Sequence, residues 1–357
     1  MYADCKISKK NKSKPGVTAI VLCYDQSRFV VECLDSVQRQ TYENIQLIIM
    51  DDASSDDSVS VINRWLKDNQ VSCTFVSHEI NLGICRTLNE ALSYAEGKYV
   101  AMVAADDLWL PEKTERQVAI MECSDQGVGA VFSDAMQIDE TGNVIQRSVL
   151  SLNKKAFNLE RGLDGDIYLD LLTANFIAAP TVLILKNCYK EIGLYDENLI
   201  YEDYDMWLRL SRRYKMKYDG LTTAKYRIHA NSAMRKTVVN RPEFQASRFI
   251  IAGKCLSSPG INAWHRLTIL KRMMVRLWEI FKSKHNDANH FMLIFVGYLK
   301  DPRNIALFVL IIFSYLFSRS IFIAREAAIR FVRLISRSVQ SAIKSIFVCF
   351  KMMFPIK

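Results

Sequence analysis

The stretches LIIMDDASSDD at residues 47–57 and YVAMVAADDLW at residues 99–109 each place two aspartates directly after an apolar run. Like charges repel when they are crowded, so proteins concentrate carboxylates where a cation or a proton transfer needs them. In an open α/β sheet, ligands bind just beyond the carboxyl ends of the strands. The pairs Asp51-Asp52 and Asp106-Asp107 therefore predict a metal-assisted site for a phosphorylated ligand.

The segments around these two pairs alternate between strand-like and helix-like patterns. Short apolar runs predict strands, and apolar residues at helical spacing predict helices between them. The expected strands are 17–23, 45–50, 73–76, 99–103 and 128–132; the expected helices are 29–37, 57–66, 84–95 and 112–121, the last with Pro111 as its first residue. This alternation implies right-handed crossovers and a mostly parallel sheet.

A third acidic pair, Glu202-Asp203 in YEDYDMWLRL, opens a predicted helix that runs to about Arg213. Acidic residues also stabilise a helix N-terminus through the helix dipole, so the pair alone does not indicate a site. Further along, the run YRIH at residues 226–229 is a basic and aromatic cluster that could hold a diphosphate. Residues 133–180, including Asn175 and Phe176, are expected to shape an acceptor site.

The charge of the chain is unevenly distributed. Residues 264–357 contain 16 Lys or Arg against 4 Asp or Glu, a net of +12, so the remaining residues carry −3 of the total of +9. The region with the acidic pairs is therefore not basic, which argues against a nucleic-acid partner. Nine Cys without a C-x-x-C spacing argue against a disulfide framework or a zinc site and favour a reducing compartment. The polar, Lys-rich start of the chain shows no secretory signal.

The order of these elements over about residues 16–232 resembles the inverting family 2 glycosyltransferases of the bacterial surface-polysaccharide type. The matching segments are VTAIVLCYD, LDSVQRQTYENIQLIIMDDASSDDS, NLGICRTLNEALSYAEGKYVAMVAADDLWLPEK, EIGLYDENLIYEDYDMWLRL and YRIHANS. The resemblance implies an α/β GT-A nucleotide-diphospho-sugar transferase fold. This fold has a mostly parallel central sheet with flanking helices, here followed by a helical C-terminal membrane-associating region.

The resemblance also implies roles for individual residues. The nucleotide sugar would be bound by Tyr24, Asp52, Asp106, Arg227 and His229; Mg²⁺ or Mn²⁺ by Asp107, Asp106 and His229; and Asp203 would be the catalytic base, with Glu202 orienting it. The sequence departs from the family at two positions. Ala104-Ala105-Asp106-Asp107 lacks the leading aspartate of the common Asp-Ala-Asp-Asp form, and Asp25 stands where asparagine is commoner.

The implied activity is the metal-dependent transfer of a hexosyl or N-acetylhexosaminyl unit from a nucleotide-diphosphate sugar to an acceptor hydroxyl, with inversion. The region LRLSRRYK lacks the Q-x-x-R-W motif of processive members, so we expect single-sugar addition. One alternative is a non-catalytic nucleotide-sugar-binding subunit of a membrane glycan-assembly complex, which the missing aspartate favours. Another is a nucleotidyltransferase, but the loop at residues 24–29 offers only Arg28 for phosphate.

We expect three parts: a basic flexible segment at 1–15, the GT-A domain at 16–240, and a helical basic and apolar region at 241–357. The apolar run 305–317 is shorter than the roughly 20 residues that span a bilayer. A basic amphipathic pattern after it fits a helix on anionic lipid, although a helical bundle is the alternative. We therefore expect a peripheral protein, or one with a single marginal segment, at the cytoplasmic face of the inner membrane, where it assembles a cell-surface glycan on a lipid-linked acceptor.

Overall fold

The computed structural model describes residues 15–151, 163–230, 232, 242–282, 288–304 and 307–308. The chain divides into two compact units, Met1–Ser247 and Arg248–Lys357, and each is described by itself. The basic N-terminal lysines, most of the apolar run 305–317 and the whole predicted amphipathic helix after it lie outside the described residues.

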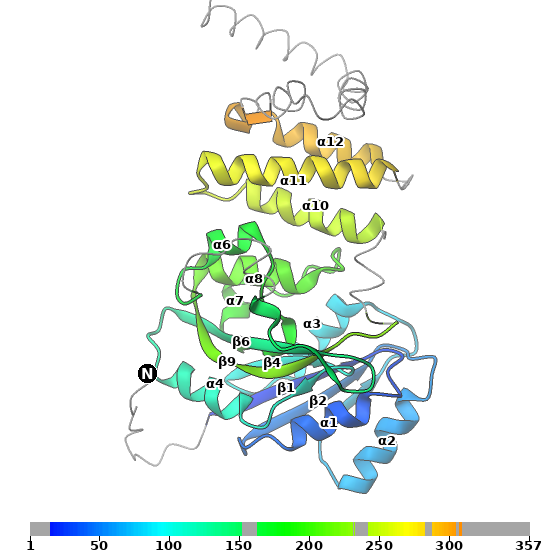
Figure 1. Cartoon of the computed structure of the whole chain (residues 1–357). Coiled ribbons are helices and arrows are strands. Elements are labelled where there is room, and N and C mark those ends of the chain that lie inside the picture. Colours follow the sequence, from blue (N-terminus) through cyan, green and yellow to red (C-terminus); the bar gives the residue numbers. More distant parts are fainter. Residues whose placement is uncertain are drawn as a thin grey trace, which may run out of the picture. The chain divides into compact units, whose positions relative to one another are not determined.

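The first unit is built on one sheet flanked by helices (Figure 1). The nine described strands run in the order β3-β2-β1-β4-β8-β6-β9-β5, and β7 pairs with β6. The strands are β1 Val17–Cys23, β2 Ile45–Asp51, β3 Thr74–Ser77, β4 Tyr99–Ala104, β5 Leu108–Trp109, β6 Val128–Ile138, β7 Val144–Gln146, β8 Leu183–Leu185 and β9 Lys215–Arg227. The helices are α1 Val30–Gln38, α2 Ser58–Asn69, α3 Ile84–Tyr94, α4 Lys113–Glu122, α6 Tyr168–Thr173, α7 Cys188–Ile192 and α8 Glu202–Arg213, with a 3₁₀ turn at Ala179–Thr181.

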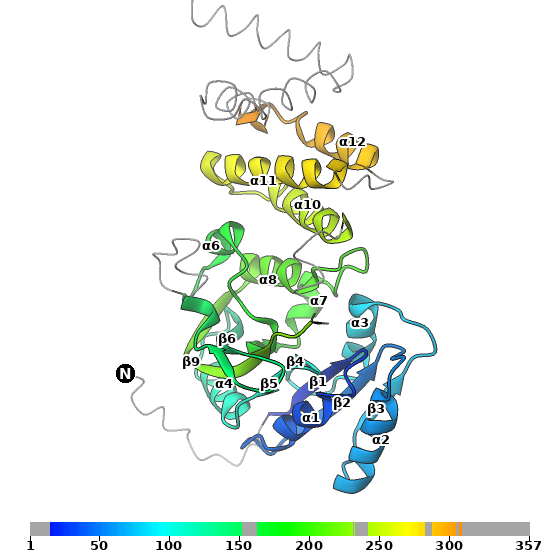
Figure 2. The same ribbon diagram turned by 45° about the vertical axis from the view of Figure 1, so that its right-hand side comes forward.

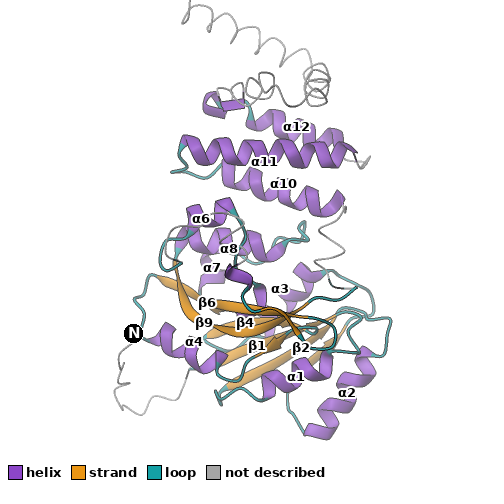
Figure 3. Ribbon diagram, viewed as in Figure 1, coloured by secondary structure: helices purple, strands orange, loops and turns teal. Residues whose placement is uncertain are grey.

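The sheet is mixed rather than mostly parallel (Figure 3). The strands β3, β2, β1 and β4 are parallel to their neighbours, as expected, and β6 is parallel to β9. The short strand β8 lies between β4 and β6 and is antiparallel to both. The prediction of a mostly parallel sheet therefore holds only for the first four strands and the β6–β9 pair. It fails elsewhere because the described residues between 133 and 200 do not form regular strand–helix crossovers.

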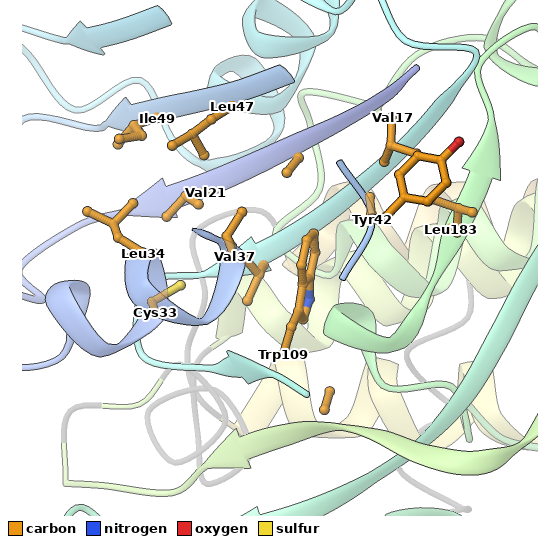
Figure 4. Close-up of a cluster of buried hydrophobic side chains, with 14 of the residues drawn as sticks. Val17, Val21, Cys33, Leu34, Val37, Tyr42, Leu47, Ile49, Trp109 and Leu183 are labelled. Atoms are coloured by element: carbon orange, nitrogen blue, oxygen red, sulfur yellow. The ribbon is translucent and has the colours of Figure 1, made fainter. Parts of the chain in front are cut away.

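The core of the sheet explains why its first strands are so apolar. Alternate residues of a strand point to opposite faces, and Val17, Ala19 and Val21 pack in one buried cluster with the apolar face of α1. Figure 4 shows Val21 and Val37 of this cluster, together with Trp109 from β5. None of the buried α3 side chains belongs to the cluster, and α3 contacts β1 and β2 separately. Both faces of the parallel strands are thus covered, which requires continuous apolar runs.

Two local predictions differ from the structure. Pro111 is not the first residue of α4, because the helix begins at Lys113 and Pro111 lies in the turn before it. The longest strand, β9, was not predicted at all. Its sequence KMKYDGLTTAKYR is mostly polar and contains Gly220 at φ 81°, so it lacks both the apolar run and the regular alternation of a strand.

The second unit contains the end of α10 (Pro242–Leu256) and the helices α11 (Ala263–Lys282) and α12 (Ala288–Tyr298) (Figure 1). Its core is aromatic, with Phe249 5.5 Å from Phe291 and 6.4 Å from Phe295 between ring centroids. None of the helices in the described part of the chain has the length and apolarity that a membrane crossing requires.

Candidate active site

The loops that follow β1, β2 and β4 meet at one edge of the sheet, because β1 lies between the other two strands. The backbone N–H of Asp52 donates to the carbonyl of Cys23 at 2.9 Å, and that of Ala105 donates to Leu22 at 2.8 Å. The first two acidic pairs thus follow neighbouring strands at their carboxyl ends, as the sequence predicted (Figure 2).

Tyr24 and Asp25 form the loop after β1. Tyr24 is 48% exposed, so its ring is accessible to a ligand. Asp25 adopts a left-handed backbone conformation with φ 53°, which Asp and Asn tolerate better than most residues. Its carboxylate accepts a hydrogen bond from the backbone N–H of Ser55 at 2.7 Å, while Ser54 Oγ accepts one from the Asp25 N–H at 2.9 Å. Asp25 therefore joins the β1 and β2 loops.

Asp52 is nearly buried and binds protein groups with both carboxylate oxygens. The backbone N–H groups of Leu82 and Gly83 donate to it at 2.8 and 2.9 Å. Its Oδ1 also lies 2.8 Å from His78 Nδ1, and the other ring nitrogen of His78 lies 3.1 Å from Glu90. Burial alone would lower the pKa of His78, but the hydrogen bonds to the two carboxylates outweigh it and raise that pKa. Asp52, the proposed ribose and base contact, is thus also the anchor of the turn at residues 81–83.

Asp106 and Asp107 form a tight turn after β4, closed by a hydrogen bond from the Asp107 N–H to the carbonyl of Ala104 at 2.9 Å. Asp107 is only 3% exposed, and its Oδ1 accepts a hydrogen bond from the backbone N–H of Arg227 at 2.8 Å. Burial and then the neighbouring charge of Asp106 raise the pKa of Asp107 well above its usual range. A buried carboxylate beside a second one is an environment that a cation would stabilise.

The strand β9 carries Arg227 and His229 to this turn, because β5 pairs with β9 directly after Asp107. Arg227 is 1% exposed, and its guanidinium donates to the backbone carbonyl of Asp106 at 2.8 Å and to the Glu32 carboxylate at 2.7 Å. Its guanidinium carbon lies 4.6 Å from the ring centroid of Phe29. Arg227 thus lies within the protein and binds the peptide group beside the acidic pair, rather than reaching into solvent.

His229 is also buried, and its ring lies 4.9 Å from that of Phe29 between centroids. Its Nε2 lies 3.0 Å from Asp106 Oδ2. The structure therefore brings together Asp106, Asp107, Arg227 and His229, which are up to 123 residues apart in the chain. Of the residues that follow, 231 and 233–241 lie outside the described residues.

The donor chemistry of the turn fits Mg²⁺ or Mn²⁺, which prefer carboxylate oxygens. Asp107 and Asp106 supply these oxygens. Burial and the charge of Asp106 raise the pKa of Asp107, and the backbone hydrogen bond and charge of Arg227 offset this only in part. His229 lies against Asp106 rather than beside both carboxylates. Within the described residues, no group of three or more His, Cys, Asp or Glu is arranged to hold a metal ion. The two aspartates are therefore the residues that fit the ion best.

Glu202 and Asp203 occupy the first turn of α8 and are partly exposed. One oxygen of Asp203 accepts a hydrogen bond from the Tyr204 N–H at 2.6 Å, and the other accepts one from Asn175 Nδ2 at 3.3 Å. Burial raises the pKa of Asp203 to about 6, against the lowering effect of these two hydrogen bonds. Burial and the charge of Asp203 raise the pKa of Glu202 to about 8. Burial thus makes both carboxyls of this pair more basic than ordinary acidic side chains.

Tyr226 is influenced by charges from both acidic pairs. Burial is the main reason why its pKa is raised well above the usual range, and the charges of Asp107, Asp106 and Asp203 raise it further. Charges from both acidic pairs, Asp106 and Asp107 in one and Asp203 in the other, therefore act on one tyrosine of β9.

Sequence reasoning missed the side chains that support the predicted ones. His78, Glu90 and Glu32 were not identified, and Phe29 was assigned only to the buried face of α1. Their partners lie far away in the chain: Glu32 pairs with Arg227 across 195 residues, and His78 with Asp52 across 26. Nothing in the local pattern around a lone His or an exposed helical Glu indicates such a partner.

A family model described as "Glycosyl transferase family 2" matches residues 18–169. The chain is 29% identical over 256 residues to the UDP-Glc:alpha-D-GlcNAc-diphosphoundecaprenol beta-1,3-glucosyltransferase WfaP of Escherichia coli, covering 71% of this chain and 90% of that one. It is 28% identical over 239 residues to the uncharacterized glycosyltransferase RT0329 of Rickettsia typhi, covering 67% of this chain and 72% of that one.

Two solved structures share the fold. The mannosyltransferase PcManGT from Pyrobaculum calidifontis, in complex with GDP-Man and Mn²⁺, superimposes with a TM-score of 0.54 at 15% identity and covers 83% of this chain and 84% of its own. S. aureus TarS 1–349, in complex with UDP-GlcNAc, gives a TM-score of 0.54 at 17% identity and covers 80% of each chain. These likenesses show an α/β fold of the GT-A type with a mixed sheet. The ligands named are those of the two solved structures.

Proposed function

Since the chain belongs to the family 2 glycosyltransferases, we propose that it transfers a single sugar from a nucleotide-diphosphate sugar to an acceptor hydroxyl with inversion. The observation that supports this proposal best is the presence of two carboxylate pairs, Asp106-Asp107 in the turn after β4 and Glu202-Asp203 in the first turn of α8. The first pair contains the buried Asp107 and is suited to a cation, and the second contains a carboxylate suited to accept a proton.

The donor side of the proposal rests on the turn at Asp106 and Asp107. These residues would hold Mg²⁺ or Mn²⁺, which would stabilise the negative charge that grows on the departing nucleotide diphosphate. Tyr24 is accessible for stacking on the base, and Asp52 anchors the neighbouring loop. Arg227 acts from behind the turn, because its guanidinium binds the Asp106 carbonyl and its N–H binds the Asp107 carboxylate.

On the acceptor side, Asp203 would take the proton of the acceptor hydroxyl. A general base must be ionised at the working pH, and a pKa of about 6 leaves Asp203 ionised at neutral pH while keeping it more basic than an ordinary aspartate. The neighbouring Glu202, with its higher pKa, is mainly protonated there. Asn175 holds one oxygen of the base, so it orients the carboxylate toward the hydroxyl. Attack from the face opposite the diphosphate inverts the anomeric centre.

The acceptor is proposed to be a lipid-linked glycan intermediate at the cytoplasmic face of the inner membrane, in assembly of a cell-surface glycan such as O-antigen, capsule or exopolysaccharide. The printed name of WfaP describes an undecaprenol-linked acceptor, and the basic C-terminal region of this chain fits a site beside anionic lipid. Residues 1–15, 16–240 and 241–357 remain the proposed functional parts: a basic segment, the GT-A domain and a membrane-associating region.

The test is a screen of the purified full chain with Mg²⁺ or Mn²⁺ against UDP-, GDP- and dTDP-sugars, with detergent-dispersed membrane lipid as acceptor and nucleotide release as readout. We expect release from one donor, and its loss on adding a chelator or in Asp107→Ala. The matched control Asp68→Ala, an exposed aspartate of α2, should release nucleotide at the wild-type rate.

A second candidate is a non-catalytic nucleotide-sugar-binding subunit. The observation that favours it is Ala104, which stands where the family commonly has the leading aspartate of the metal motif. Saturable donor binding without nucleotide release, for every donor and in the presence of acceptor lipid, would support this candidate and contradict the transferase proposal.

A further inference from the structure

We propose that one face of α11, formed by Trp264, Lys271, Val275 and Trp278, docks the chain on an anionic lipid surface. The inference deepens the proposed function, since it rests on a membrane setting and names the residues that would meet the lipid. Its physical basis, however, lies in α11 alone and not in the active site.

The four residues lie on one side of the helix. They are spaced seven, four and three residues apart, which returns to the same side at 3.6 residues per turn. Trp264 is 59% exposed, Trp278 is 52% exposed and Val275 is 42% exposed. Lys271 is also exposed and lies between the two tryptophans. The face is therefore a continuous stripe along α11 rather than one isolated apolar residue.

The opposite side of α11 is the core of the second unit. The side chains that share it are almost completely buried: Ile269, Leu270, Met273, Leu277 and Ile280. These buried residues fix the rotation of α11 about its own axis. The side with the tryptophans therefore faces away from the core of the second unit. The amphipathic pattern of α11 is thus satisfied by the core, and the stripe is a second apolar feature that is exposed in the described part of the chain.

Exposed tryptophan is unusual in this chain. The other three tryptophans, Trp65, Trp109 and Trp207, are at most 5% exposed. Tryptophan is enriched at membrane–water interfaces because its ring is apolar and its N–H is polar. Two exposed tryptophans flanking a valine and a lysine have the composition of a helix face that lies in the interface plane. The stripe therefore fits the headgroup region of a bilayer better than it fits water.

Charge decides between a membrane and a second copy of the chain. Lys271 lies on the face itself, and residues 264–357 contain 16 Lys or Arg against 4 Asp or Glu. Two copies docked through this face would bring like charges together, which is costly at an interface. Anionic lipid headgroups would instead attract these basic residues. The occupant that the face fits is thus an anionic bilayer.

The tryptophans themselves supply the readout. We would add phosphatidylglycerol/phosphatidylcholine vesicles to the full chain, without donor or acceptor, and record tryptophan emission. Since the other three tryptophans are buried, a blue shift and quenching by brominated lipid report on Trp264 and Trp278. We expect both changes with anionic vesicles, and much smaller changes with pure phosphatidylcholine vesicles or at high salt.

Two variants test the face by co-sedimentation with anionic vesicles. Trp264→Ala/Trp278→Ala should lower the vesicle partition coefficient by more than roughly tenfold, because two large interfacial side chains are removed. Lys271→Glu reverses one charge and should lower it by about tenfold. Its matched control is Lys67→Glu on α2, an exposed lysine of the first unit, which should bind as the wild type does. Circular dichroism would check that each variant is folded.

Wild-type vesicle binding by Lys271→Glu and by a folded double tryptophan variant would overturn the proposal. So would a wild-type dimer in sedimentation velocity that both variants dissociate, because the face would then bind a second copy. Loss of vesicle binding with unchanged transfer to a detergent-dispersed acceptor would support the docking face. Absence of transfer with intact, tryptophan-dependent vesicle binding would instead contradict the proposed function alone.

Discussion

The two carboxylate pairs of the candidate site are held in opposite ways. In the Asp106-Asp107 turn, Asp107 is buried, a backbone hydrogen bond closes the turn, and Arg227 binds both residues. Asp203 lies on the partly exposed first turn of α8, held by its helix and by one amide, Asn175. The two pairs therefore differ in rigidity. The Asp106-Asp107 turn is held by the sheet before any ligand binds, whereas the position and pKa of Asp203 depend on a few weak contacts.

The largest expected effect comes from removing the base itself. Asp203→Asn keeps the shape of the side chain but removes its ability to accept a proton. We expect kcat for sugar transfer to fall by about 10³-fold, which is within the range for general-base catalysis. The affinity for the donor should stay within about twofold of the wild-type value, because only the proton transfer is removed. Transfer kinetics and donor titration measure the two quantities. Wild-type turnover in Asp203→Asn would assign the base to another residue.

The rigidity of the cation side is tested by Arg227→Ala. Removing this guanidinium leaves the Asp106 carbonyl with one donor fewer and removes the partner of the Glu32 carboxylate. We expect the free energy of unfolding to fall by about 3 kcal/mol, since Arg227 is buried and its loss also leaves a cavity. Chemical denaturation measures this value.

Arg28→Ala is a close control for that variant. Arg28 also contacts the Phe29 ring and pairs with a glutamate, Glu140, but its side chain is 59% exposed. Exposed ion pairs contribute about 0–1 kcal/mol, so Arg28→Ala should change stability by no more than that. If the two variants were equally stable, Arg227 would not support the turn, and the contrast between the two carboxylate pairs would fail.

The sequence predicts the Asp106-Asp107 turn, but it does not predict the strand that supports this turn. The strands β1, β2 and β4 are covered on both faces, so their continuous apolar runs and the acids after them were predictable. The supporting strand β9 is polar, and its pairing with β5 joins Leu108 to Lys225 across 117 residues. The burial of Arg227 follows from that pairing, and no local pattern encodes it. For the same reason Arg227 was predicted to contact the diphosphate directly.

The tuning of the base side is tested by Asn175→Ala. The Asn175 hydrogen bond lowers the pKa of Asp203, so its loss should raise that pKa above the wild-type value of about 6. Transfer requires ionised Asp203, so the acid limb of the kcat–pH profile should move to higher pH. A lost charge-assisted hydrogen bond of about 1.4 kcal/mol makes Asp203 roughly tenfold harder to ionise, so we expect kcat at pH 6 to fall by about fivefold and to recover above pH 8.

Three other groups around Asp203 could shift the acid limb of the kcat–pH profile: Glu202 on the same turn, Tyr226 on β9, and Tyr201. The hydroxyl of Tyr201 accepts a hydrogen bond from Asn175 at 3.1 Å. Tyr201→Phe is therefore the control, because it keeps Asn175 and removes only the second contact of the amide. An unchanged acid limb in Asn175→Ala would mean that the amide does not act on the base.

The smallest effect is expected at His78, which supports the donor side away from the acidic turn. Its folded-state pKa is raised by Asp52 and Glu90 against the effect of burial. The protonated form is therefore bound more tightly in the folded state than in the unfolded one. This stabilisation is fully present below the unfolded-state pKa of about 6.5 and is lost as pH rises through the higher folded-state pKa.

His78→Gln keeps hydrogen-bonding capacity but cannot titrate. The difference in the free energy of unfolding between the wild type and this variant should therefore be largest below about pH 6.5 and should decrease as the pH is raised above it. A difference that is constant with pH would mean that folding does not change the proton affinity of His78, and the Asp52 anchor would then be independent of pH.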